Sequence, residues 1–574
     1  MNDPDTYHFL WFLCHAEFAQ NLGQENEPPG IIFAYLPYFQ PDRVAFKISR
    51  PHHDPAGRGT CWDTNFKIRF YLVIIFPLCN DFADFLRETS VNLLLEASLM
   101  VRLFLLSVLG FVWLTGCSTF PTVPDLGNLY NQLAQQEDPA RNPVIVIPGI
   151  LGSRLEDGNT GETVWGAFGS GAVDPTSAEG APLLALPMAP GADLKDLQDS
   201  VREAGALDRV VLSFFGIPIE LNAYYNILRS LGVGGYRDQQ LAESHAVDYG
   251  NRHFTCFQFA YDWRRDLVES AQKLDRFIKE KEIEVQQEIF KRYGVKRSSV
   301  KFDLVAHSMG SLVARYYLRY GAADLPADGS LPPVTWEGAK HVDHLVLIGP
   351  PNAGSVETLT ILVDGLKPAP LLSTYPAAIV GTMPSVYQLL PRSRHRPLLD
   401  VDGQPVPDVF DPALWERHGW GLADPSQDDI LANLLPDISD AQERRHVALD
   451  HLRKVLARAK QLTAALDVPA NPPATTPILL VAGDSMATMS TAQIQPDGRL
   501  KIIEHAPGDG VVLRQSALMD EREEKKLGNR LTSPIGWSQV LFIFSDHLGM
   551  TKDPAFVDNI LYFLLESPRS ESST

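Results

Sequence analysis

A serine in a turn of small residues is the residue of this chain best placed for covalent chemistry. Ser308 stands in the segment AHSMG, between the apolar run FDLV and the helix-like run SLVARYYL. Small residues two places before and after such a serine allow a strand to turn sharply into a helix and expose the hydroxyl. The strand, turn and helix context predicts that Ser308 is a nucleophile.

A nucleophilic serine needs a histidine base, and His547 has the most suitable position. It follows the apolar segment VLFIFSD and precedes the last helix-like segment. In the α/β-hydrolase fold the nucleophile, the acid and the histidine follow in that order. The acid remains open between Asp484, which ends the run ILLVAG, and Asp509, which stands in PGDG. Either carboxylate could hold the imidazole tautomer.

Two backbone amides are predicted to bind the oxyanion. The N–H of Met309 opens the helix after the serine, where the helix dipole favours negative charge. The second donor of this fold comes from a loop after an earlier strand, and the segment PGILG after VIVI supplies the N–H of Ile150.

The elements that position these groups begin at Pro143. Apolar runs near residues 144, 257, 302, 345, 478 and 540 alternate with helix-like segments, among them 270–293 and 556–566. Such alternation predicts a parallel sheet with helical crossovers. We therefore expect an α/β-hydrolase fold, a mostly parallel sheet flanked by helices, over residues 143–570. A Gly-, Ala-, Pro- and Ser-rich lid at about 155–205 is expected to be mobile, and a cap of loops and helices is expected at about 366–473.

Residues 100–117 read MVRLFLLSVLGFVWLTGC and are typical of a lipoprotein signal peptide. Cys117 would then carry the lipid, residues 118–142 would form a tether, and the protein would lie in the cell envelope, at the outer membrane or periplasmic face. Two interpretations of residues 1–99 remain open: an extension read from a wrong start codon, or a domain followed by a membrane anchor.

Composition excludes some partners. The formal net charge of −20 argues against nucleic acid, whose phosphates require a basic face. Five cysteines show neither CxxC pairing nor histidines at metal spacing, so we expect no metal site and no disulfide framework.

Several segments in a fixed order resemble the lecithin:cholesterol acyltransferase family, which includes lysosomal phospholipase A2 and phospholipid:diacylglycerol acyltransferase. They are VIVIPGILGSRLE, FAYDWRRD, LVAHSMGSLVARYYL, LIGPPNAGS, MPSVYQLLP, APGDGVV and SDHLGM. The resemblance implies that Asp509 is the acid and that Ile150 supplies an oxyanion amide. The chain departs from the family at Ala306, at Val511 and in a lid without cysteine.

The resemblance implies an acyltransferase or acyl hydrolase for glycerolipid or phospholipid esters, with Ser308 taking the acyl group and water or an alcohol removing it. It implies no cofactor, and its partners would be lipid and a membrane surface. A triacylglycerol lipase or simple carboxylesterase is the alternative, and a non-catalytic lipid-binding lipoprotein is a third. In FAYDWRRD, an Asp262–Arg264 pair that braces the sheet edge is favoured over a substrate site. The sequence does not indicate the acyl acceptor or the oligomeric state.

Overall fold

A computed structural model gives the fold of residues 124–568, apart from 137, 168–171, 208–209, 215–216, 222–223, 368–372 and 523–529; at 210–214 and 217–221 only the backbone is described. These residues lie in the second of two units of the chain, Thr119–Thr574. The predicted signal peptide and Cys117 therefore lie outside the described residues. Within the described part, no helix combines the length and the apolar character needed to cross a membrane.

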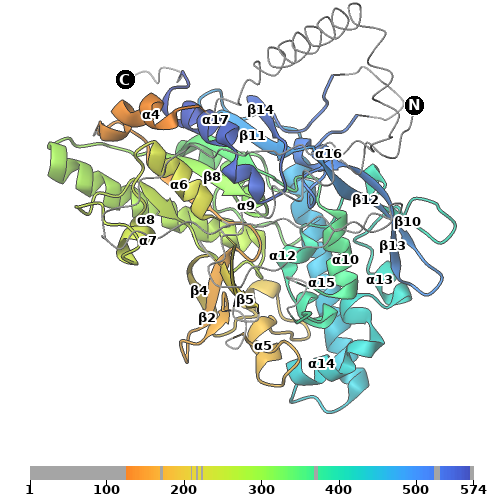
Figure 1. Cartoon of the computed structure of the whole chain (residues 1–574). Coiled ribbons are helices and arrows are strands. Elements are labelled where there is room, and N and C mark those ends of the chain that lie inside the picture. The colour runs from red at the N-terminus through yellow and green to blue at the C-terminus, as the bar shows by residue number, and fades with distance from the viewer. Residues whose placement is uncertain are drawn as a thin grey trace, which may run out of the picture. The chain divides into compact units, whose positions relative to one another are not determined.

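The centre of the molecule is a six-stranded sheet in the order β14-β11-β9-β8-β1-β7 (Figure 1). Every neighbouring pair of strands is parallel, which confirms the predicted fold class. The strands are β1 (Val144–Ile147), β7 (Cys256–Gln258), β8 (Phe302–His307), β9 (Val342–Ile348), β11 (Ile478–Gly483) and β14 (Gln539–Ile543).

Helices cover both faces of this sheet, which explains why its strands are continuous apolar runs. Alternate side chains of a strand point to opposite faces. Val144 and Val146 of β1 enter a core with α4 (Leu126–Gln135), α6 (Tyr225–Val233) and α17 (Pro554–Leu565). Ile145 and Ile147 enter the opposite core with α8 (Leu267–Tyr293) and α9 (Gly310–Tyr320).

The lid region contains more regular structure than its composition suggests. Strands β2 (Ser153–Asp157), β3 (Thr163–Trp165) and β4 (Val201–Ala206) form a small antiparallel sheet, and α5 (Gly180–Leu184) follows β3. A separate hairpin joins β5 (Val210–Phe214) to β6 (Ile217–Leu221). The short helix α7 (Gln239–Glu243) precedes β7.

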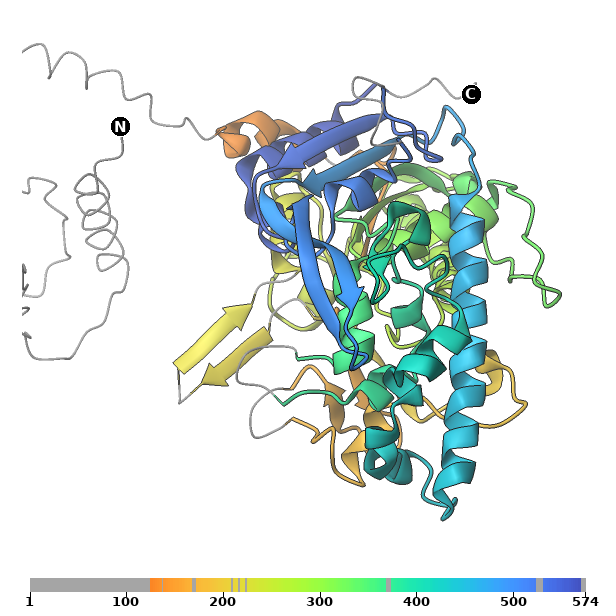
Figure 2. The same cartoon turned by 90° about the vertical axis from the view of Figure 1, so that its right-hand side faces the viewer.

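Helices dominate the predicted cap region. After α10 (Val356–Asp364) come α11 (Ala377–Val380), α12 (Pro384–Tyr387), α13 (Pro412–His418), α14 (Asp428–Leu434) and α15 (Ala441–Asp467), the long upright helix at the right of Figure 2. Beyond the cap lies an antiparallel hairpin, β12 (Met486–Ile494) and β13 (Leu500–Gly508), paired with β10 (Leu398–Leu399). This hairpin, which was not predicted from the sequence, leads into Asp509 and is followed by α16 (Arg514–Leu518).

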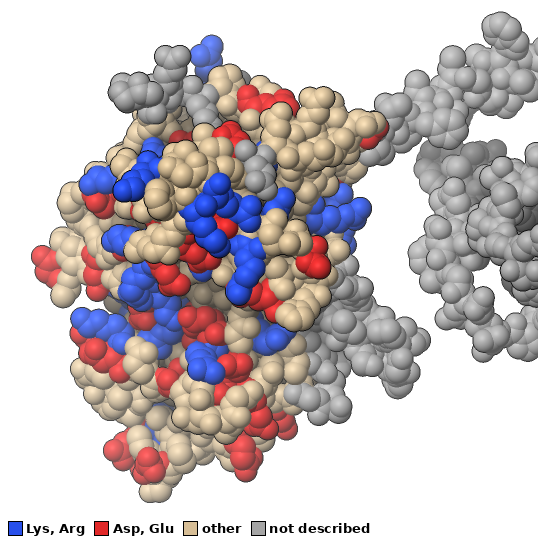
Figure 3. Space-filling model, turned by 90° about the vertical axis from the view of Figure 1, so that its left-hand side faces the viewer, with Lys and Arg blue, Asp and Glu red and all other residues tan. Residues whose placement is uncertain are grey.

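The face drawn in Figure 3 carries acidic and basic side chains side by side. Ion pairs within α8 include Lys279 with Asp275 and Arg292 with Glu288. Ion pairs at a protein surface typically add little to stability, about 0–1 kcal/mol each.

Candidate active site

Ser308 occupies a strained turn between β8 and α9. Its φ is +53°, a left-handed conformation that side chains rarely adopt. The backbone N–H of Ser308 donates to the carbonyl oxygen of Ile348 at 2.8 Å, which ties the turn to β9. A side chain at Gly310 would collide with the carbonyl oxygen of Pro148. These contacts explain the glycine two residues after the serine and hold the serine hydroxyl at the carboxyl end of the sheet.

Three side chains from distant parts of the chain form a hydrogen-bonded series at this turn. His547 Nε2 lies 3.0 Å from Ser308 Oγ, and His547 Nδ1 lies 2.8 Å from Asp509 Oδ2. His547 stands in the loop after β14, and Asp509 follows β13. The series has the order of nucleophile, base and acid that serine acyl transfer uses.

The carboxyl of Asp509 is suited to remain ionised beside the imidazole. It is only 2% exposed, and Oδ1 accepts the N–H groups of Val512 at 2.7 Å and Val511 at 3.0 Å. Burial alone would raise its pKa, but His547 and these two amides together lower the pKa below its ordinary value. An ionised Asp509 keeps the proton of His547 on Nδ1 and leaves Nε2 free to accept one from Ser308.

The two carboxylates considered from the sequence have different surroundings. Asp484, directly after β11, pairs through Oδ2 with Arg514 at 3.2 Å. Asp509 contacts the ring of His547. The structure therefore brings Asp509, and not Asp484, to the histidine.

The loop after β1 lies against the serine. A Cβ placed on Gly149 would be 2.7 Å from Cβ of Ser308, so only glycine allows this approach. The loop closes through a hydrogen bond from Gly152 N–H to the Gly149 carbonyl oxygen at 3.1 Å, with Leu151 at φ +62°. Among the described residues, nothing accepts a hydrogen bond from the N–H of Ile150 or Met309. Both amides are therefore available to an oxyanion.

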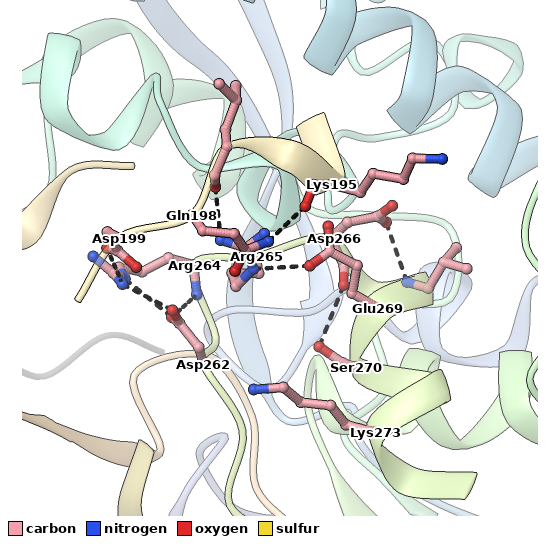
Figure 4. Close-up of polar contacts among 12 residues, drawn as sticks. Lys195, Gln198, Asp199, Asp262, Arg264, Arg265, Asp266, Glu269, Ser270 and Lys273 are labelled. Atoms are coloured by element: carbon pink, nitrogen blue, oxygen red, sulfur yellow. Dashed lines mark hydrogen bonds and ion pairs between the residues drawn. The ribbon is translucent and has the colours of Figure 1, made fainter. Parts of the chain in front are cut away.

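The lid is anchored by the Asp262–Arg264 pair, which lies in the loop after β7. Arg264 is fully buried and contacts Asp262 through two nitrogens, at 3.0 and 2.8 Å, and Asp199 at 2.7 Å (Figure 4). Its remaining nitrogen donates to the carbonyl oxygens of Leu183 and Ala185, both at 3.1 Å. The pair therefore braces the edge of the sheet and also fixes the lid to that edge.

Three side chains near Ser308 were not predicted from the sequence. Glu357, on α10, has a buried Oε2 without a hydrogen-bond partner among the described residues, and burial raises its pKa against the opposing effect of His547. His307 and Tyr224 are buried beside Ser308. The only sequence signal for His307 is that it directly precedes Ser308, and no motif surrounds the other two.

The group with donors of the kind that bind metals lies at the opposite end of the strands. Asp303, Asp343 and His344 are at the starts of β8 and β9. His344 Nδ1 is 3.0 Å from Asp303 Oδ1 and 3.3 Å from Asp343 Oδ2. Burial opposes protonation of this ring, but hydrogen bonds to both carboxylates raise its pKa to about 9. A protonated His344 partly balances the negative charge of the two carboxylates of this cluster.

Comparison with models of protein families gives a match to one part of the chain. The model of the lecithin:cholesterol acyltransferase family matches residues 239–417. No curated protein matches the sequence.

Solved structures resemble the chain at low identity. The structure described as the Tle4–Tli4 complex is 16% identical, with a TM-score of 0.43, and the match covers 74% of this chain and 98% of that one. The Bacillus licheniformis lipase BlEst2 in propeptide form is 12% identical, with a TM-score of 0.25 and coverage of 77% and 54%. EstA from Clostridium botulinum is 13% identical, with a TM-score of 0.27 and coverage of 75% and 88%.

The family match spans Ser308 and the first part of the cap, and it supports an enzyme that acts on lipid esters. The resemblance to the lecithin:cholesterol acyltransferase family, predicted from motifs, is therefore confirmed over residues 239–417.

Proposed function

We propose that this protein is a serine acyl hydrolase and acyltransferase that acts on acyl esters of glycerolipids or phospholipids. The observation that carries the proposal is the series from Asp509 through His547 to Ser308, at a turn that faces two unengaged amides. The family match supports lipid esters as the substrate class.

The proposed reaction begins when Ser308 Oγ attacks the ester carbonyl carbon while His547 Nε2 takes the hydroxyl proton. The oxyanion faces the N–H groups of Ile150 and Met309, and loss of one such donor typically raises the barrier by about 3–4 kcal/mol. His547 then gives its proton to the leaving alcohol, and the acyl group remains on Ser308.

The second half of the proposed reaction removes the acyl group and regenerates the free Ser308 hydroxyl. His547 removes a proton from water or from an alcohol, whose oxygen attacks the acyl carbon. Collapse of this intermediate releases a fatty acid or a new ester, and His547 returns the proton to Ser308 Oγ. Asp509 stabilises the imidazolium in both halves.

The Ser308→Ala variant tests the nucleophile. We expect a fluorophosphonate probe to label the native protein at Ser308, and the variant to lose both the label and phospholipid hydrolysis while its circular dichroism is unchanged. A native protein that binds phospholipid without being labelled would instead be a non-catalytic lipid-binding protein. Hydrolysis of triacylglycerol or simple esters, with phospholipid left intact, would favour the plain lipase or esterase.

The acyl acceptor is tested with a phospholipid labelled in its acyl chain, supplied with and without a long-chain alcohol. We expect labelled fatty acid in both cases and labelled ester when the alcohol is present at a lipid surface. If no ester forms at saturating alcohol, the transferase half of the proposal fails and hydrolysis stands alone.

We further propose that Cys117 carries a lipid that holds the protein at the cell envelope, on the outer membrane or periplasmic face. The signal-like run of residues 100–117 supports this proposal. A lipid anchor would keep the active site close to a membrane surface that contains its substrates.

A further inference from the structure

Two buried polar side chains beside Ser308 have no part in the proposed proton transfer. His307 ends β8 and is 2% exposed, and Tyr224, which directly precedes α6, is 4% exposed. Their rings meet edge to face with centroids 5.6 Å apart. Because burying a polar group without hydrogen bonds is unfavourable, their hydrogen-bond partners indicate what they hold in place.

His307 holds the main chain of the histidine loop. Its Nε2 lies 3.1 Å from the carbonyl oxygen of His547, and the two imidazole rings are 4.8 Å apart. A carbonyl oxygen only accepts, so His307 Nε2 carries the proton and donates it, which leaves Nδ1 as an acceptor. Burial, together with the charge of His547, lowers the pKa of His307 to about 3. The ring therefore stays neutral, and this one tautomer is kept.

Tyr224 holds the loop that carries the oxyanion donor. The N–H of Gly149 donates to Tyr224 Oη at 2.8 Å. The same hydroxyl faces His307 Nδ1 at 3.5 Å and donates its hydrogen in that direction. From the other side, Tyr261 Oη donates to the carbonyl oxygen of Pro148 at 2.8 Å. These two bonds hold the peptide group between Pro148 and Gly149. The Gly152 N–H holds the carbonyl oxygen of the next peptide group, to which the N–H of Ile150 belongs, so this N–H has a fixed direction.

The hydrogen bonds form one continuous path around the nucleophile. It runs from Gly149 N–H to the Tyr224 hydroxyl, on to His307 Nδ1, and from His307 Nε2–H to the carbonyl oxygen of His547. One end of the path is the residue before the proposed Ile150 donor, and the other is the backbone of the proposed base. In a hydrogen-bonded chain each bond strengthens its neighbours.

We propose that Tyr224 and His307 are positioning residues that fix the oxyanion loop and His547 at one spacing about Ser308. This inference rests on the proposed function, in which both sides must meet the same tetrahedral intermediate. Neither side chain touches the reacting atoms. A misplacement of about 1 Å can slow an enzyme about 100-fold, so a looser link should reduce turnover more than substrate binding.

The Tyr224→Phe variant removes the hydroxyl and keeps the ring. With a soluble short-chain ester, we expect kcat to fall about 10- to 100-fold with KM within about twofold of the native value. The Tyr236→Phe variant is the matched control, because Tyr236 is a buried tyrosine of the same core, and we expect native kcat. Circular dichroism and the melting temperature show whether each variant is folded.

Two variants at His307 test the second link independently of Tyr224. A glutamine has an amide N–H₂ that can reach the carbonyl oxygen of His547, whereas a leucine has no donor. We expect His307→Gln to keep kcat within about fivefold and His307→Leu to lose at least as much as Tyr224→Phe. The double variant Tyr224→Phe/His307→Leu should be no slower than His307→Leu alone, because both changes break one path.

Native kcat in folded Tyr224→Phe would overturn the inference, as would equal kcat in His307→Gln and His307→Leu, or additive losses in the double variant. Fluorophosphonate labelling of Ser308 in the native protein separates this result from failure of the proposed function. If the native protein is not labelled, the proposed function fails. If it is labelled and the variants keep native kcat, only the positioning role fails.

Discussion

Replacing Asp509 by asparagine tests the order of the three side chains. The side-chain oxygen of an asparagine can still accept the N–H groups of Val511 and Val512. Its NH₂ group then faces His547 Nδ1, where the carboxylate oxygen was. Because that group only donates, Nδ1 must become the acceptor and the ring proton moves to Nε2. His547 then presents N–H to Ser308 Oγ and cannot take its proton.

We expect Asp509→Asn to lower kcat by about 10⁴-fold, the loss typical of a misoriented histidine tautomer. This corresponds to about 5 kcal/mol in the barrier. KM for a soluble p-nitrophenyl ester should change little, because the substitution alters proton transfer and leaves the binding surface intact. The two retained hydrogen bonds from the N–H groups of Val511 and Val512 should keep the variant folded, which circular dichroism would check.

The control is Asp484→Asn. Asp484 pairs with Arg514, whose side chain is 46% exposed, so we expect kcat within a few-fold of native. If Asp484→Asn were the inactive variant, or if Asp509→Asn kept more than a tenth of native turnover, the assignment of the acid would be wrong.

Three further predictions concern the sheet and the chain start. The His344 pKa of about 9 lies above its unfolded value of about 6.5, so protonation of His344 stabilises the fold by about 3 kcal/mol below pH 6.5, and this is lost as the pH rises through 9. The melting temperature should therefore fall between these pH values, less steeply in His344→Gln than in the native protein, and equal slopes of melting temperature against pH in the two proteins would contradict this. Gly149→Ala should abolish esterase activity, because its Cβ would meet Ser308, whereas Gly232→Ala, with open space around its Cβ, should be active; an active Gly149→Ala would disprove the close approach. Palmitate label on protein expressed from Met100 should vanish in Cys117→Ser, and activity should survive removal of residues 1–99; persistent label or lost activity would refute the predicted start.

The parallel sheet and the strand–turn–helix at Ser308 could be predicted because their signals are local. A buried parallel strand must be apolar on both faces, and VIVI and FDLVAH satisfy this within a few residues. The turn at Ser308 requires small residues at fixed offsets. The place of His547 in the loop after the last strand could be predicted from the order of the chain, and the structure puts it 3.0 Å from Ser308 Oγ.

The remaining features depend on contacts between distant segments. Asp484 and Asp509 are both acids that follow strands, and only the fold brings Asp509, 38 residues before His547, to the ring. The β12–β13 hairpin is largely exposed along β13, so it lacks the apolar alternation that identifies a strand. Tyr224 contacts a glycine 75 residues away without any motif around it.

The anchored lid changes the expectation for the acyl acceptor. A mobile lid rich in small residues and without a disulfide would exclude water poorly and would favour hydrolysis over transfer. In the structure, the buried Arg264 guanidinium ties the lid to the sheet through Asp262, Asp199 and two carbonyl oxygens. The lid also reaches the oxyanion loop, where Trp165 Nε1 donates to the carbonyl oxygen of Leu151 at 2.9 Å. Opening it would separate the buried Arg264 guanidinium from Asp199 and the lid carbonyl oxygens, which is unfavourable.

The Arg264→Lys variant should therefore shift the products toward water. A lysine keeps the charge but cannot make the paired contacts to Asp262 while also reaching Asp199 and the lid carbonyls. With labelled phospholipid and a fixed amount of long-chain alcohol, we expect the ratio of free fatty acid to new ester to rise, while Ser308 is still labelled by fluorophosphonate. Lys279→Ala, which removes a lysine on α8 whose side chain is 56% exposed, is the control and should keep the native ratio. An unchanged ratio in folded Arg264→Lys would show that the Arg264 contacts do not control the access of water to the acyl-enzyme.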